Sequence, residues 1–90
     1  MNKGELVANI SEAGNMTRAT ARRALDVVLA NMTSAMRKGE RVTITGFGSF
    51  RVIDRAAQKG RNPQTGQAIM IPARKVVKFK PAKKLAERVD

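Results

Sequence analysis

Basic side chains flank a polar turn in the second half of the chain. The turn is Gly60-Arg61-Asn62-Pro63-Gln64-Thr65-Gly66-Gln67, and the cations on it and on the strands beside it are Arg55, Lys59, Arg61, Arg74 and Lys75. A solvated hairpin is one interpretation of such a charge run. However, an ordinary solvated surface mixes both signs of charge, and no Asp or Glu lies between residues 55 and 80. The pattern therefore predicts phosphate binding, with Arg61 as the first candidate for entry into a groove.

Pro63 is the apolar residue at the centre of this polar turn. It could be an ordinary turn proline, since Asn-Pro favours a turn and Gly66 can supply a positive φ. It could also be a wedge, because its ring is rigid and can stack against a base step opened from the minor groove. Unstacking costs a few kcal/mol per step, and wider wrapping of the nucleic acid offsets that cost. Asn62 and Gln64 could read only the A·T versus G·C pattern there.

Further cations lie where helices are expected to begin. Lys3 is close to the start of the chain, and Lys80, Lys83 and Lys84 surround the start of the last predicted helix. Free N–H groups at a helix N-terminus attract phosphate, and an adjacent lysine strengthens that attraction. These four residues are candidate phosphate contacts, with plain surface lysine as the alternative.

The composition excludes several other kinds of site. The 90 residues contain no Cys and no His, so we expect no disulfide, no metal site or cofactor built on those residues and no histidine base. No cluster of carboxylates replaces them, and an enzyme is not expected. The formal net charge of +11 indicates a nucleic acid or an anionic membrane surface as partner.

Two helices are predicted before the first strand. Asn2 can cap the first helix, with Gly14 as a left-handed residue at its end. Thr17 can cap the second, which Lys38-Gly39 would end. Apolar residues of this helix recur at the three-to-four spacing of an amphipathic helix: Ala21, Ala24, Leu25, Val28, Leu29, Met32, Ala35 and Met36. Off that stripe we expect surface or intersubunit charge at Arg22, Arg23, Arg37 and Lys38.

The apolar period changes to two after residue 40, which predicts strands. Gly46-Phe47-Gly48 reads as a tight turn, and the runs Ser49–Lys59 and Ala68–Lys80 have the lengths of a long hairpin. Pro72 predicts an edge or a bulge. Pro81 suits the first turn of a short last helix.

The fold class predicted from this order is α+β in a single domain, residues 1–90. Residues 1–39 would form a helical base, 40–80 a three-stranded antiparallel sheet with an arm at about 54–75, and 81–90 a C-terminal helix. A body this small buries only about 60% of its unfolded surface, so oligomerisation is expected. Phe47, Phe50 and Phe79 are assigned to a core shared across a dimer interface.

Three segments together resemble the bacterial HU/IHF family of DNA-bending proteins. They are Gly46-Phe47-Gly48-Ser49-Phe50, then Gly60-Arg61-Asn62-Pro63-Gln64-Thr65-Gly66, then Phe79-Lys80-Pro81 with Lys83, and the opening Met1-Asn2-Lys3-Gly4-Glu5-Leu6 is similar to HU. The resemblance implies an intertwined dimer, a saddle with two β-ribbon arms, and minor-groove binding that bends duplex DNA. It also implies a cytoplasmic protein of the bacterial nucleoid, without a membrane or small-molecule partner.

Some positions depart from the common HU pattern. Ile53 and Gln58 stand where many relatives have arginine, so two arm-base contacts are in doubt. The run from Ala73 to Val77 is closer to the alpha subunit of integration host factor, which leaves an IHF-like half of a heterodimer as an alternative to an HU-like homodimer. Thr45 and the absence of an extended tail favour HU. An RNA-binding protein and a membrane-active cationic protein are further alternatives, which the motif at the tip and the β-ribbon disfavour.

Overall fold

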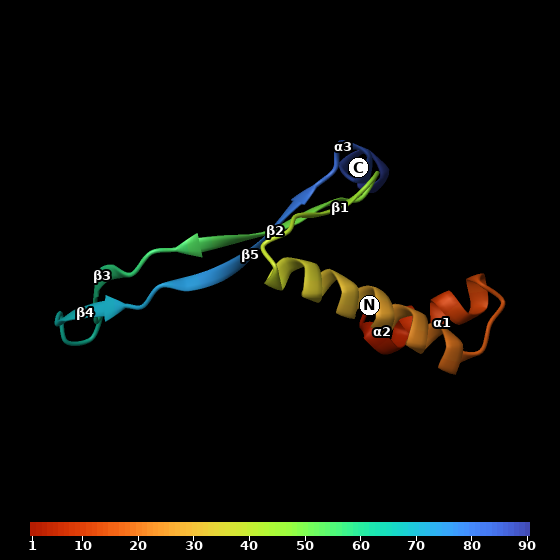
Figure 1. Cartoon of the computed structure of the whole chain (residues 1–90), viewed down its shortest axis with the longest axis horizontal. Helices are drawn as coiled ribbons and strands as arrows, with labels where there is room; N and C mark the ends of the chain where they lie inside the picture. Colours follow the sequence, from red (N-terminus) through yellow and green to blue (C-terminus); the bar gives the residue numbers. More distant parts are fainter.

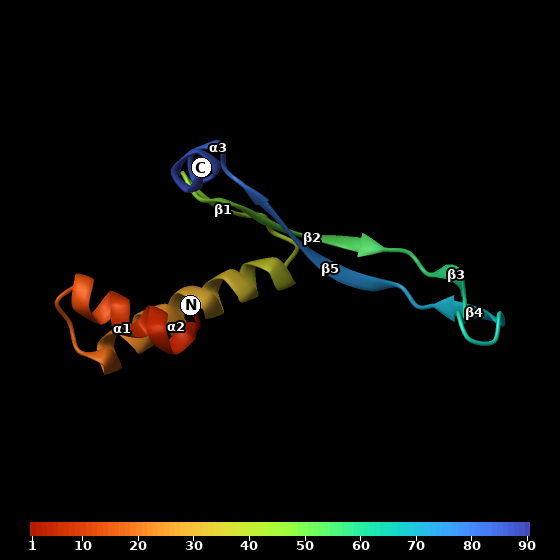
Figure 2. The ribbon, with the colours of Figure 1, turned by 180° about the vertical axis from the view of Figure 1, so that it is seen from behind.

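The protein is elongated, with a helical base at one end and a β-ribbon arm at the other. The computed structural model describes residues 1–90, and its principal extents are 57 × 29 × 29 Å. The radius of gyration is 18.7 Å, whereas a compact chain of this length has about 12 Å. Both ribbon views show the arm projecting away from the helices and from the sheet (Figures 1 and 2). None of the helices combines the length and apolar character that a membrane span requires.

The two N-terminal helices begin at the predicted caps. Helix α1 spans Lys3–Ala13, and the side chain of Asn2 accepts a hydrogen bond from the Glu5 N–H at 2.8 Å. Helix α2 spans Arg18–Arg37, and the Thr17 hydroxyl accepts from the Thr20 N–H at 3.1 Å. Helix α2 ends at Lys38, followed by Gly39 at φ +81°. These caps confirm that local sequence signals place both helices.

The end of α1 differs from the prediction. Gly14 has φ −89°, which is right-handed, and Asn15 takes the positive φ of 52°. Asn is one of the few residues that tolerate this region, because its short side chain can bond locally. The space at Gly14 is tight: a Cβ there would lie 2.5 Å from the terminal methyl of Met16, which would have to move, and 3.0 Å from the Ile10 carbonyl oxygen.

The strands form a sheet and a separate ribbon. Strands β1 (Val42–Ile44), β2 (Gly48–Arg55) and β5 (Arg74–Pro81) make an antiparallel sheet in the order β1-β2-β5. Strands β3 (Gln58–Arg61) and β4 (Ala68–Ile71) pair antiparallel at the end of the arm. The long hairpin and the α+β class predicted from the sequence are therefore confirmed.

The arm contains one break, at the proline where the sequence predicts an edge or a bulge. Ladder pairing stops at Ala56-Ala57 on one strand and at Pro72-Ala73 on the other. Proline has no N–H to donate to a ladder, which accounts for a break at this point. The register is the same on both sides, since Arg55 faces Arg74 and Gln58 faces Ile71. Pro72 thus marks an interruption with no extra residue, rather than a bulge.

The C-terminal helix starts later than predicted. Pro81 is the last residue of β5, where it faces Gly48, and helix α3 spans Lys83–Val89. Ala82 occupies the N-cap position without a side-chain hydrogen bond. Its N–H instead donates to the Phe47 carbonyl at 2.9 Å. This bond ties α3 to the turn between β1 and β2.

The single chain encloses almost no core. Val7 and Ala21 are its only buried apolar side chains. Phe79 contacts both other phenylalanines, with ring centroids 5.7 Å apart for Phe47–Phe79 and 4.7 Å for Phe50–Phe79. Phe47 and Phe79 are nevertheless 44% and 43% exposed. A packed aromatic cluster that remains this open leaves a large apolar surface uncovered in one chain.

Gly48 is required beneath this cluster. A Cβ at this position would lie 2.6 Å from the Phe79 ring and 2.7 Å from the Lys80 carbonyl oxygen. Because backbone cannot give way as a flexible side chain can, no larger residue fits without moving β5 away from β2. The turn lies at residues 45–47, one residue earlier than predicted, and Gly48 is the first residue of β2. Gly48 therefore serves close packing of strand and ring rather than the turn role assigned from the sequence.

Candidate nucleic-acid interface

The tip of the arm is a closed polar turn that presents Pro63. The Asn62 N–H donates to the Gln67 carbonyl at 2.9 Å, and the Gly66 N–H donates to the Asn62 carbonyl at 2.7 Å. The side chain of Asn62 accepts from the Gln64 N–H at 2.9 Å. Gly66 has the predicted positive φ, at 72°. Pro63 and Gln64 are exposed, whereas Asn62 is half-buried because its amide organises the turn.

The strand register gathers the cations on one face of the arm. Side chains alternate between the two faces of a strand, and residues directly opposite each other share a face. In the sheet, Ser49 faces Lys80, Arg51 faces Lys78 and Arg55 faces Arg74; at the tip, Lys59 faces Met70 and Arg61 faces Ala68. Since the pairing register is unchanged across the break, the same alternation links the two ladders, and we call this set of residues the cationic face: Ser49, Arg51, Ile53, Arg55, Lys59, Arg61, Ala68, Met70, Arg74, Val76, Lys78 and Lys80.

Most, but not all, of the predicted arm residues belong to the cationic face. Arg55, Lys59, Arg61, Arg74 and Lys80 do, and the tip turn adds Asn62, Pro63 and Gln64 at its end. Lys75 does not, since it faces Asp54 on the opposite side of the ribbon. The structure therefore separates Lys75 from the other predicted phosphate contacts of the arm.

Sequence reasoning missed three cations beside the sheet. Arg41, Arg51 and Lys78 line a depression of about 400 Å³ together with Lys80. Arg41 and Lys80 also line a neighbouring depression of about 450 Å³ with Lys83. Arg51 could have been found from the sequence, because the period-two pattern that begins at Ser49 puts Ser49 and Arg51 on the same face of the strand. Without the register of β5, however, Lys78 could not be assigned opposite Arg51.

Like charges face each other across this ribbon. Arg51 is opposite Lys78 and Arg55 is opposite Arg74, an arrangement that destabilises an isolated strand pair. None of these cations forms an ion pair with a carboxylate of the chain. Repulsion of this kind is relieved by a polyanion that lies along the face. The charge pattern thus fits nucleic acid better than a self-contained hairpin.

The two departures from the HU pattern have different consequences. Ile53 lies on the cationic face opposite Val76. This half-buried apolar pair separates the cation pair at Arg51 from the cation pair at Arg55. Gln58 lies on the other face, opposite Ile71. An arginine lost at position 53 therefore interrupts the stripe, whereas one lost at position 58 leaves it unchanged.

The body adds cations near two helix starts. Lys83 and Lys84 are in the first turn of α3, and the aliphatic stem of Lys84 passes about 4.0 Å from the site where Gly46 would carry a Cβ. Lys3 is the first residue of α1 and forms an ion pair with Asp26 of α2, at 2.6 Å between Nζ and Oδ1. Lys3 is therefore placed as predicted, but it already has an anionic partner in the chain.

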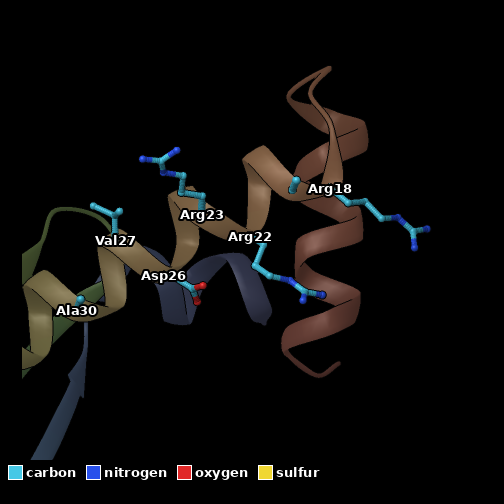
Figure 3. Close-up of a pocket in the computed structure, with 7 residues that line it drawn as sticks. Arg18, Arg22, Arg23, Asp26, Val27 and Ala30 are labelled. Atoms are coloured by element: carbon cyan, nitrogen blue, oxygen red, sulfur yellow. The ribbon is translucent and has the colours of Figure 1, made fainter.

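Helix α2 carries a further basic patch. Arg18, Arg22 and Arg23 line a depression of about 640 Å³ with Ala19, Asp26, Val27 and Ala30 (Figure 3). Arg22 extends towards α1, where it shares a second depression with Lys3. Arg23 and Val27 point away from α1 (Figure 3). Arg22 is thus close to a predicted phosphate contact, although the sequence pattern indicated only surface or intersubunit charge.

Comparison with known proteins identifies DNA-binding relatives that match this chain over its full length. The bacterial DNA-binding protein family matches residues 1–90. DNA-binding protein HU from Geobacillus stearothermophilus is 48% identical over 89 residues, which cover 99% of each chain. HU-beta from Serratia marcescens is 46% identical over 90 residues, 100% of both chains.

Solved structures of HU proteins also superpose on this chain. HU from Anabaena, in a cocrystal structure with DNA, superposes with a TM-score of 0.90 at 40% identity and covers 99% of this chain and 97% of that one. HU from Thermotoga maritima superposes with a TM-score of 0.72 at 33% identity, over 100% of both chains. Sequence and fold thus agree over the whole length, and the chain belongs to the HU/IHF family of bacterial DNA-binding proteins.

Proposed function

We propose that this protein binds duplex DNA as a homodimer and bends it with two arms, each inserting Pro63 into the minor groove. The observation that carries this proposal is the cationic face, whose like-charged cross-strand pairs have no carboxylate partner. The face leads directly to an exposed proline in a closed turn. Family membership supports an architectural DNA-binding role and agrees with the expectation that the chain is not an enzyme.

The dimer follows from the apolar surface that one chain leaves open. Val28, Leu29 and Ile44 are 50%, 43% and 40% exposed, in addition to the two open phenylalanines. Exposure of this extent marks an interaction site in a soluble chain. A second copy that packs its own phenylalanine cluster against the first would cover these residues and would put two arms on one saddle.

In this proposal, the body residues hold the DNA on either side of the bend. Lys80 and Lys83 border the sheet beside Arg41, and Lys84 follows in α3. Lys3 would contact phosphate either after its ion pair with Asp26 breaks or while its ammonium group binds both the phosphate and the Asp26 carboxylate. The site of action would be the bacterial nucleoid, and selectivity would come from DNA that is already easy to kink.

The electrostatic part of the proposal predicts a steep salt dependence. If a dimer neutralises about six phosphates, log K against log salt concentration should have a slope near −5, at about −0.9 per phosphate. Fluorescence anisotropy of a labelled linear duplex over a salt series measures this slope. A slope near zero would contradict phosphate neutralisation by the cationic face.

The IHF-like alternative differs in how strongly it selects one sequence. For an HU-like protein we expect similar affinity for several unrelated linear duplexes at one salt concentration, and tighter binding to a nicked duplex. The reason is that a nick removes part of the cost of kinking. One linear sequence bound more tightly by about 4 kcal/mol, the lower end of the usual gap between specific and non-specific sites, would favour the IHF-like alternative instead.

A further inference from the structure

Strand β4 presents apolar side chains to solvent on an arm that is otherwise polar and charged. Ile69, Met70 and Ile71 are 46%, 63% and 38% exposed. A two-stranded ribbon has no second layer that could cover them. Met70, the most exposed of the three, is the one whose surroundings decide whether a partner buries it. Neither Met70 nor its neighbours were assigned a role from the charge pattern of the arm.

Ile69 and Ile71 lie on one face of the ribbon and Met70 on the other, and only the isoleucines have packing contacts within the ribbon. Ile69 and Ile71 share the face of Gly60, and a Cβ at Gly60 would lie 3.0 Å from the Ile71 Cδ1 atom and 3.7 Å from the Ile69 Cγ1 atom. The side chains of these two isoleucines therefore pack against the Gly60 backbone, within the ribbon. Met70 has no such support, because it lies on the cationic face opposite Lys59.

Met70 is surrounded by groups that attract a polyanion. Lys59 is its cross-strand partner, and Arg61 faces Ala68 two pairs nearer the tip, on the same face. These cations oppose a second copy of the same arm, since it would bring like charges together. A partner that satisfies this face must offer phosphates to the cations and an apolar surface to the methionine.

The minor groove of DNA offers both, because its deoxyribose walls are apolar and carry the phosphates at their rims. Methionine is among the apolar residues that proteins insert into this groove. At about 3.4 Å per strand residue, Met70 lies roughly 7 Å behind the last pair of the ribbon, a spacing of about two base steps along one DNA strand. The ribbon would therefore carry Met70 along the groove that Pro63 enters.

We infer that Met70, together with the small Ala68 beside it, is a contact residue for the deoxyribose wall of the minor groove, so that this arm binds through an apolar strip as well as through charge. This inference rests on the proposed function of the arm. It assigns to Met70 a part of the affinity that salt does not screen. The cations Lys59 and Arg61 on the same face supply the part that salt does screen.

The test separates these two parts of the affinity. Met70→Gln keeps the length of the side chain but makes it polar. We expect about tenfold weaker binding of a linear duplex, since partial burial of one methionine on each arm of a dimer contributes about that factor. The loss should be the same at every salt concentration, so the slope of log K against log salt stays unchanged. Lys59→Gln should instead make that slope shallower.

Three control variants locate the contact. Met70→Leu retains an apolar side chain and should bind within about twofold of the original protein. Val89→Gln changes an apolar residue in α3 that is 79% exposed, away from the arm, and should have no effect. Ile69→Thr changes the other face of the ribbon with a side chain that suits a strand, and it should weaken binding less than Met70→Gln does.

Each other outcome overturns the inference. Unchanged affinity in Met70→Gln would show that the methionine does not contact the DNA. A loss that disappears at high salt would assign its effect to charge, and a larger loss in Ile69→Thr would place the groove wall on the opposite face. Failure of the proposed function is distinguishable, since the unsubstituted protein would then show weak binding and a slope near zero.

Discussion

Pro63→Ala is expected to abolish most of the DNA bend while leaving the dimer and the arm intact. Pro63 contributes no N–H to the tip, and every hydrogen bond that closes the turn is made by other residues. Alanine can therefore occupy the position without opening the turn. It has no ring to stack against an unstacked base step, so a cost of a few kcal/mol per kink is no longer offset.

Fluorescence transfer between dyes at the two ends of a short duplex measures this bend. Gln67→Ala is the matched control, because Gln67 is exposed, lies in the same turn, and takes part in the hydrogen bonds of the turn only through its backbone N–H and carbonyl. The control should bend DNA as the original protein does. A full bend angle with Pro63→Ala would refute the wedge and return Pro63 to the role of an ordinary turn residue.

Phe79→Ala is expected to destabilise the dimer by about 3–5 kcal/mol for each copy of the site, the usual range for removing a buried aromatic ring. Phe79 contacts both other phenylalanine rings and packs beneath the Gly48 backbone. Its remaining exposure of 43% in one chain is the surface that a second copy would cover. With Val7 and Ala21 as the only buried apolar side chains, the chain has little other core to compensate.

Sedimentation equilibrium and thermal unfolding at several protein concentrations measure this effect. The midpoint of unfolding should rise with concentration in the original protein, because association stabilises the folded chain. Val27→Ala is the control, since Val27 is 53% exposed, points away from α1 (Figure 3) and lines the basic depression of Arg18, Arg22 and Arg23. An unchanged dimer and an unchanged midpoint for Phe79→Ala would contradict a shared aromatic core.

Local signals accounted for most of the secondary structure. Asn2 and Thr17 cap the two helices, Gly66 has a positive φ in the tip turn, and the change of period after residue 40 marks the strands. Each of these features depends on neighbours within a few residues. One error was also local, since Asn15 rather than Gly14 has the left-handed conformation. The other was not, since Pro81 stays in β5 opposite Gly48, which is far from it in the sequence.

The sequence by itself determined the chemistry of this protein: a basic chain with no Cys or His, a proline in a polar turn, and a body so small that oligomerisation is expected. Only the tertiary structure decided which cations are paired across the strands. A slip of one residue in register would move every side chain of a strand to the other face. The pairing of Arg51 with Lys78 and of Lys59 with Met70, and the separation of Lys75 from both, follow from contacts between strands far apart in sequence. The pattern within one strand cannot specify that pairing, because the register depends on the turn and on the side chains of both strands together.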